Sequence, residues 1–196
     1  MEFILDRVEE KRLLERAQQG DAEAFGALYR AHVQTIHRYI YHRVNDNHLA
    51  EDLTADVFTR ALRDLPKYRE RGKPFIAWLY RIAHARVIDH YRRVERRPAE
   101  SDVNAEPLAV TPNMDAEMMR HYAAQALRQA IAALTEEQQQ VIILRFIEGY
   151  RIDAVAQVMG KKPNAIKALQ HRALRSLASR LEEAGFDVES IMAGLS

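Results

Sequence analysis

The sequence predicts an all-α protein made of two small helical domains joined by a flexible linker. Apolar residues recur three and four positions apart along most of the 196 residues, without the alternation typical of strands. Glycine is scarce, with seven in the chain. Residues 98–114 contain three prolines and almost no periodicity, as linkers do. The predicted boundaries are 1–97 for the first domain, 98–117 for the linker, 118–182 for the second domain and 183–196 for a tail.

The helical pattern of the first domain begins at Ala22, where Asp21 can cap a helix that continues to Val44. Residues 45–47, Asn-Asp-Asn, break the chain and cap the next helix, which ends at Pro66. The apolar face of that helix is Leu49, Leu53, Val57, Ala61 and Leu65, widened by Phe58 and Leu62. After a polar loop over 67–74, an amphipathic and increasingly basic helix covers residues 75–93.

The second domain opens with a predicted helix over about 115–133. Thr135 and Gln138 form a capping box for the following helix, which Gly149 terminates. A short helix over 152–159, a turn over 160–162 and a last helix starting at Pro163 follow. The buried side of the last helix is Ile166, Leu169, Ala173, Leu174, Leu177 and Leu181. A short helix, a glycine-containing turn and a basic helix are the pattern of a helix-turn-helix.

Composition argues against several classes of function. The chain has no cysteine, which excludes disulfides, zinc-thiolate sites and cysteine nucleophiles. His32, His37 and His42 are each rotated by about 140° from the last on a helix, so they do not converge on a metal. No glycine-rich phosphate loop or nucleophile elbow is present. We therefore expect no enzyme, catalytic residue, metal or cofactor.

Targeting signals are equally absent from the sequence. The first residues show no secretory signal, and no apolar run approaches the roughly 18 residues needed to span a bilayer. We expect a cytoplasmic protein without membrane insertion.

The net charge of +1 conceals two basic blocks, over 60–97 and 161–180, the second without any acidic residue. Two such blocks with acidic residues between them indicate two contacts with a polyanion. On the last helix the exposed candidates for DNA contact are Asn164, Lys167, Ala168, His171, Arg172 and Arg175, preceded by Lys161 and Lys162. A tight helical hairpin in an ordinary bundle would explain the apolar spacing of this segment equally well.

The first basic block interleaves arginines with Phe75, Trp78, Tyr80 and Tyr91, as proteins that bind single-stranded nucleic acid do. Alternatively Phe75 and Trp78 are core residues, and binding falls to the loop over 67–74 and the polar face of the helix. Glu51, Asp52 and Asp56 lie together on the preceding helix and can form a docking face for a basic partner.

Several of these segments resemble the bacterial sigma factors. Residues 50–58 (AEDLTADVF), 75–83 (FIAWLYRIA) and 88–93 (IDHYRR) are similar to the second sigma domain, and residues 134–146 (LTEEQQQVIILRF) and 152–177 to the fourth. The match covers about residues 15–95 and 120–180, in the family's order. Two domains joined by a short linker are the layout of the extracytoplasmic function (ECF) group, group IV of the family.

The resemblance implies a factor that binds core RNA polymerase and directs promoter-specific initiation, with an anti-sigma protein as a further partner. Core polymerase would contact Glu51, Asp52, Asp56 and Phe58. The −10 element would be bound and melted by Lys67, Arg69, Arg71, Lys73, Trp78, Arg81, His84, Arg86, Arg92 and Arg93. The −35 element would be read by Lys161, Lys162, Asn164, Lys167, Ala168, His171, Arg172 and Arg175.

The chain departs from the family pattern at three places. Ala55 stands where glutamine is usual, and His84 where asparagine is frequent. Residues 162–167 (KPNAIK) replace the usual serine or threonine cap followed by Gly-Thr-Val-Lys. Two other functions compete with the sigma interpretation: a conventional helix-turn-helix regulator, which leaves the first domain unexplained, and a helical protein that occupies a partner without starting transcription.

Overall fold

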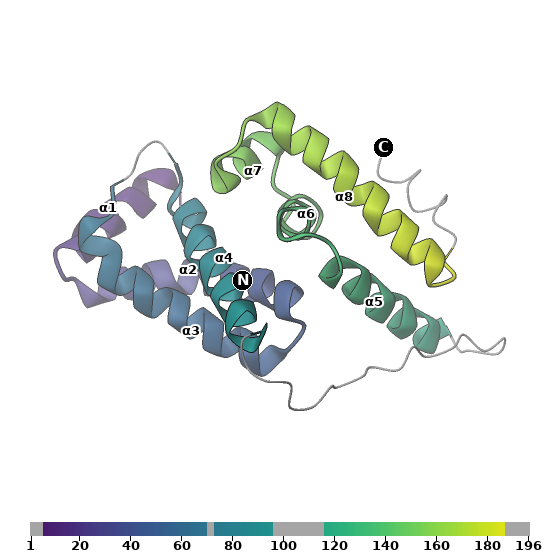
Figure 1. Ribbon diagram of the computed structural model, residues 1–196. Coiled ribbons are helices and arrows are strands. Elements are labelled where there is room, and N and C mark those ends of the chain that lie inside the picture. Colours follow the sequence, from purple (N-terminus) through teal and green to yellow (C-terminus); the bar gives the residue numbers. More distant parts are fainter. Residues whose placement is uncertain (1–5, 70–72, 96–115, 187–196) are drawn as a thin grey trace.

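The computed structural model describes residues 6–69, 73–95 and 116–186, and every regular element in these ranges is a helix (Figure 1). This confirms the all-α prediction. The first group of elements is α1 (Arg7–Gln18), α2 (Ala22–Val44), α3 (Asn47–Asp64), the 3-10 turn η1 (Leu65–Lys67) and α4 (Phe75–Glu95). The second is α5 (Ala116–Ala132), α6 (Glu136–Ile142), the π-helical turn η2 (Ile143–Ile147), α7 (Ile152–Met159) and α8 (Pro163–Glu183). The linker predicted over 98–117 falls outside the described residues, apart from its last two, which belong to α5.

The helix boundaries of the first domain follow from its capping residues. The Asp21 carboxylate accepts a hydrogen bond from the backbone N–H of Ala24 (3.0 Å), and that of Asp46 accepts from Leu49 (3.0 Å). Between them Asn45 adopts a left-handed conformation (φ 54°), which asparagine tolerates better than most residues. The predicted break between α2 and α3 is thereby confirmed.

Three features of the first domain differ from the sequence prediction. Helix α1 was not predicted, although the Asp6 carboxylate caps it by accepting from Val8 and Glu9 (both 2.8 Å). Pro66 lies within η1 rather than directly after α3. Leu62, assigned to the apolar face, is 51% exposed, because none of the described elements covers its side of α3.

The second domain confirms the capping box and the helix-turn-helix. Thr135 Oγ1 accepts from the Gln138 N–H, and the Gln138 side chain accepts from the Thr135 N–H. The predicted helix continues past Ile142 as the π-helical turn η2, which the sequence pattern did not indicate. Gly149 (φ 71°) and Gly160 (φ 66°) then supply the left-handed turns before and after α7.

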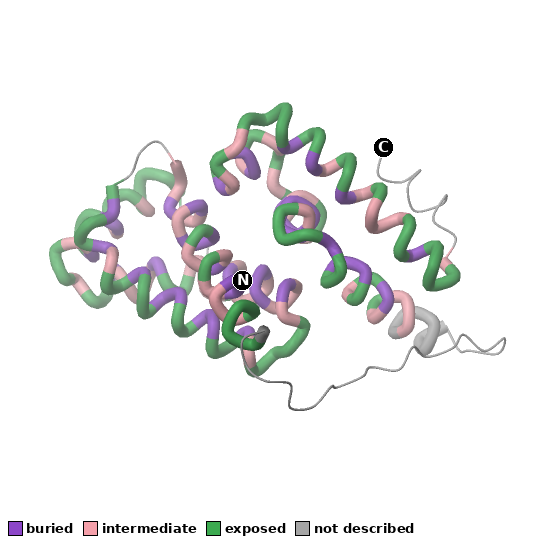
Figure 2. Tube along the Cα trace, viewed as in Figure 1, coloured by how far each residue is buried: buried purple, intermediate pink, exposed green. Residues whose placement is uncertain are grey.

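The two domains pack against each other, with buried residues of both in one continuous apolar cluster (Figures 1 and 2). Helix α4 contacts α7, and α2 contacts α5 and η2. Arg38 on α2 forms a bidentate pair with Glu148, from Nε to Oε1 (2.8 Å) and from Nη2 to Oε2 (2.7 Å). The Tyr80 and Tyr150 rings meet edge to face at 5.9 Å. No helix in the described ranges carries an apolar stretch long enough to cross a membrane.

Candidate nucleic-acid and polymerase interfaces

Helix α8 presents the predicted reading face to solvent. Ile166, Leu169 and Ala173 are buried, and on α7 Val155 and Ala156 are buried too, which fixes the two helices in the helix-turn-helix arrangement. The predicted contact residues are all exposed: Asn164, Lys167, Ala168, His171, Arg172 and Arg175. Their exposure agrees with the prediction, and the DNA contact itself stays a prediction.

The start of α8 is suited to binding an anion. Pro163 occupies the first turn, and no acidic residue lies there to neutralise the positive end of the helix dipole. Lys162 is the N-cap residue and is exposed. Lys161 is partly engaged within the protein, because its Nζ lies 2.7 Å from Glu137 Oε1 at the start of α6.

Tyr68, directly after η1, and Phe75 and Trp78, at the start of α4, form a cluster of aromatic side chains. Trp78 is half-buried, with its ring 4.7 Å from Tyr68 and 5.5 Å from Phe75, which is itself 1% exposed. Phe75 is therefore a core residue, the alternative favoured by its helical spacing, whereas Trp78 packs against the core and its contact with DNA stays a prediction. Of the basic residues predicted here, Lys67 and Arg69 are exposed, Lys73 is half-buried and Arg71 lies outside the described residues.

On α4 the predicted DNA contacts fall into two environments. Arg81, Arg92 and Arg93 are exposed. Arg86 is 17% exposed and its Nη2 lies 2.7 Å from Asp56 Oδ2 on α3. A residue predicted to bind DNA and one predicted to bind polymerase thus form an ion pair with each other.

His84 is half-buried on α4 rather than on an open face. Its Nδ1 is 3.2 Å from Nη1 of Arg43, whose guanidinium also donates to the Tyr39 hydroxyl (3.2 Å). Burial, and secondarily Arg43, lower the pKa of His84, while Glu136 and Glu137 of α6 act in the opposite direction. His84 is therefore neutral near pH 7 and can accept the hydrogen bond from Arg43.

Arg43 is a residue that the sequence reasoning missed. It is 2% exposed, and it joins α2 to α4 through His84. The available signal was an arginine placed four residues after Tyr39 on an otherwise apolar helix face, a spacing at which helical side chains meet.

The acidic face predicted to dock on polymerase is accessible on α3. Glu51, Asp52 and Asp56 are exposed, whereas Phe58 is 4% exposed and packs edge to face on Tyr29 at 4.8 Å. Phe58 therefore supports this face from beneath, and a direct polymerase contact by its side chain does not fit the structure. Ala55 lines a hollow of about 390 Å³ between α2 and α3, beside Glu51. The family's larger glutamine would project into this space.

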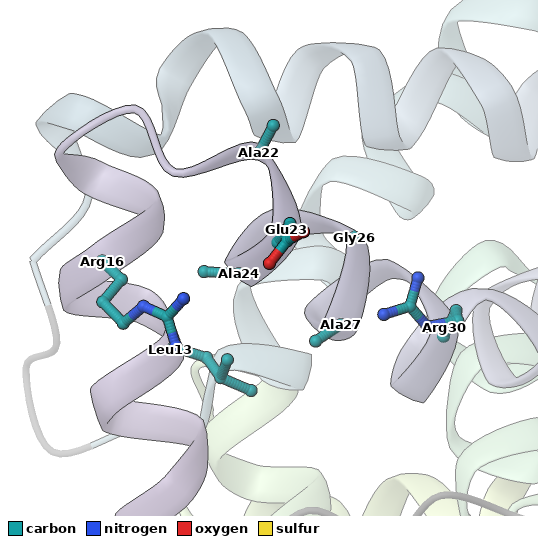
Figure 3. A pocket seen from close by; sticks show the side chains of 8 residues that line it. All are labelled: Leu13, Arg16, Ala22, Glu23, Ala24, Gly26, Ala27 and Arg30. Carbon is teal, nitrogen blue, oxygen red and sulfur yellow. The ribbon is translucent and has the colours of Figure 1, made fainter.

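A second hollow, of about 610 Å³, lies between α1 and α2 (Figure 3). Its charged lining residues are Arg16, Glu23 and Arg30, among small side chains such as Ala24 and Gly26. Arg16 is already paired with Asp21 (2.7 Å). This lining offers no nucleophile beside a base, so it does not suggest catalysis.

Comparison with known proteins matches both domains. Residues 28–97 match the family model for Sigma-70 region 2, and residues 124–177 match that for Sigma-70 region 4. The chain is 40% identical over 175 residues to the ECF RNA polymerase sigma factor BldN of Streptomyces coelicolor, covering 87% of this chain and 65%, just under two thirds, of BldN. It is 32% identical over 182 residues to the ECF RNA polymerase sigma factor ShbA of Streptomyces griseus, covering 87% of this chain and 94% of ShbA.

Solved structures share the fold. CnrH in complex with the cytosolic domain of CnrY aligns with a TM-score of 0.67 at 23% identity, over 89% of this chain and 98% of that chain. The sigma factor RpoE in complex with the anti-sigma factor NepR from Bartonella quintana aligns with a TM-score of 0.60 at 20% identity, over 82% and 98%.

Proposed function

Because the chain belongs to the ECF group of RNA polymerase sigma factors, which are not enzymes, we propose that it binds core RNA polymerase and directs it to specific promoters. The observation that carries the proposal is the presence of both sigma regions in one chain, each with its candidate binding face exposed. Polymerase docks on the acidic face of α3, the loop and α4 engage the −10 element, and α8 reads the −35 element. The protein acts in the cytoplasm, where polymerase and promoter DNA are found.

Run-off transcription with purified core polymerase tests the proposal, using a promoter taken from upstream of the protein's own gene. A discrete transcript that depends on the added protein is the expected result. Co-elution with core polymerase without any transcript from a panel of promoters would favour a non-initiating mimic. Tight binding to duplex DNA with no co-elution would favour an ordinary helix-turn-helix regulator.

The polymerase face is best tested at Asp52. It is exposed, whereas Asp56 is paired with Arg86, so that a change at Asp56 would also disturb α4. Asp52→Ala should slow association with core polymerase and weaken its salt dependence, as loss of a rim charge does. Glu15→Ala, which removes the same charge from exposed α1, is the matched control and should have no effect.

The reading helix is tested through salt dependence. In the holoenzyme, Lys167→Ala and Arg172→Ala should each reduce the slope of log affinity against log salt by about 0.9, the value for one lost phosphate contact. Arg180→Ala removes an exposed arginine near the far end of the same helix and serves as the control. Unchanged slopes in both test variants would contradict a phosphate role for this face.

We further propose that an anti-sigma protein binds this chain, as the family resemblance implies. The interaction is tested by co-purification of the tagged full chain from its native host, followed by reconstitution with the recovered protein. A protein that binds and lowers the run-off transcript would support the proposal. A bound protein that leaves the transcript unchanged would contradict it.

A further inference from the structure

The guanidinium of Arg43 fixes the position of the hydrogen atom on the His84 imidazole. Arg43 Nη1 lies 3.2 Å from His84 Nδ1. A guanidinium has only N–H donors and keeps its charge in proteins, so it cannot accept a hydrogen bond. Nδ1 must therefore be the acceptor, and the single hydrogen of the neutral ring is on Nε2. Because burial lowers the pKa of His84, the ring is neutral near pH 7 and this tautomer is the one present.

Arg43 is held in place by tyrosine side chains of two helices. Its Nη1 donates to the Tyr39 hydroxyl (3.2 Å), and its guanidinium lies 6.0 Å from the centre of the Tyr39 ring. The Tyr91 hydroxyl of α4 donates to the Arg43 carbonyl (2.7 Å). Within the described residues no carboxylate pairs with Arg43, although the residue is only 2% exposed. A buried charge without a counter-charge lowers stability, so packing alone does not account for an arginine here.

The other ring nitrogen of His84 points away from Arg43 and stays accessible. The two nitrogens face in different directions, so Nε2 cannot turn towards Arg43 while Nδ1 is bound. Among the described residues Nε2 has no hydrogen-bond partner, and it is not one of their buried unpaired atoms. Arg81 is exposed three residues earlier on α4, a spacing that places it on the same side of the helix. His84 thus presents a single N–H donor beside an exposed cation.

We propose that His84 reads the −10 element only as a hydrogen-bond donor, with Nε2–H directed at an acceptor on a base edge and Arg81 at a neighbouring phosphate. The inference rests on the proposed initiation function and adds the chemistry of the base. In the major groove guanine presents two acceptors and thymine presents O4, whereas cytosine presents an amino donor. Asparagine, frequent at this position in the family, supplies a donor and an acceptor and can bind adenine through both. A histidine fixed by Arg43 lacks the acceptor, so adenine loses its advantage over guanine and thymine.

Nitrogen NMR of the full chain tests the tautomer without polymerase or DNA. A ring nitrogen that carries hydrogen gives a different resonance from one that does not, and the His84 signals are identified by their absence in His84→Gln. We expect hydrogen on Nε2 alone in the natural protein at pH 7.5, and a detectable fraction on Nδ1 in Arg43→Met, which lacks the donors. Arg43→Lys keeps a donor and should restore the single form. Hydrogen on Nδ1 in the natural protein would overturn the proposal, whether or not Arg43→Met folds.

Run-off transcription from promoters that carry each of the four bases at every −10 position tests the contact. At one position His84→Asn should raise transcription from adenine, relative to guanine or thymine, about fivefold, the lower end of the value of a bidentate contact. His48→Asn, at an exposed histidine of α3, is the matched control and should leave the base preference unchanged. Identical preferences in His84→Asn and the natural protein would overturn the donor proposal and leave the initiation function standing. Absence of a transcript from every promoter would instead contradict the initiation function itself, and with it the contact.

Discussion

Removal of the Arg38 side chain should weaken the closure of the two domains more than removal of its partner, Glu148. The Glu148 side chain is 2% exposed and that of Arg38 is 42% exposed. Arg38→Ala therefore leaves a carboxylate buried without its bidentate partner, at the contact between α2 and the second domain. Glu148→Ala instead leaves a guanidinium that water already reaches. The cost is asymmetric because a buried charge without its partner is penalised more than a solvated one.

The burial of the two side chains sets the free-energy cost of each substitution. Removing one partner of a buried ion pair costs about 3–5 kcal/mol. Since water can enter the space left by Arg38, we expect about 2 kcal/mol for Arg38→Ala and about 0.5–1 kcal/mol for Glu148→Ala. At about 1.4 kcal/mol per tenfold change, Arg38→Ala shifts the equilibrium between closed and open domains about 30-fold towards the open form.

Energy transfer between dyes on the two domains measures this equilibrium. Ala55→Cys on α3 and Ala168→Cys on α8 are exposed attachment points in a chain without other cysteines. Transfer efficiency should fall most in Arg38→Ala and less in Glu148→Ala. The double variant should resemble Glu148→Ala, because the buried carboxylate is then gone as well. Equal effects of the single variants, or a double variant equal to their sum, would refute the reasoning.

Three further predictions concern stability. Burial and Arg43 lower the pKa of His84, so below about pH 6.5 the native state binds fewer protons at this residue than the unfolded state does. The free energy of unfolding therefore loses nothing from His84 above about pH 6.5 and falls as the pH drops below that value. Thermal melts from pH 7.5 to 5.5 should therefore show a smaller loss of stability in His84→Gln than in the natural protein. Thr135→Ala removes the hydrogen bond that Thr135 Oγ1 accepts from the Gln138 N–H and should cost about 1 kcal/mol in urea unfolding, while Thr135→Ser should cost little. Ile166→Ala, at a residue with 0% exposure, should cost about 2–5 kcal/mol in the same assay, against almost nothing for Leu62→Ala at 51% exposure.

Short-range signals in the sequence were sufficient to predict most of the helices. Asp21, Asp46 and the pair Thr135–Gln138 act within one helical turn, so their spacing specifies the helix starts. Helix α1 has the same kind of signal at Asp6, and the prediction overlooked it. The π-helical turn at Ile143–Ile147 could not be predicted, since it follows from how the end of α6 packs and not from a local motif.

The exposed residues of the candidate interfaces could be predicted from the sequence. The side-chain pairs between segments that are distant in the sequence could not. The exposed face of α8 follows from which positions of a single helix are apolar. Arg38 and Glu148 are 110 residues apart in sequence, and no local pattern indicates that they pair. The same applies to Asp56 and Arg86, which are predicted to contact different partners and form an ion pair with each other. His84, predicted as a DNA contact from the resemblance, is half-buried and pairs with Arg43, which is 41 residues away in the sequence.

In the proposed function, promoter binding is limited by the packing of the two domains against each other. The predicted DNA-binding faces themselves are exposed. Lys167 and Arg172 on α8 and Arg92 and Arg93 on α4 are all exposed while Arg38 holds Glu148. Each face can therefore meet a phosphate backbone in the closed form, but the shared apolar core fixes the distance and angle between the two faces. Binding both promoter elements at once requires that core to separate whenever their spacing does not match the closed arrangement. Weakening the Arg38–Glu148 pair should consequently favour simultaneous engagement of both elements and leave the affinity for either element alone unchanged.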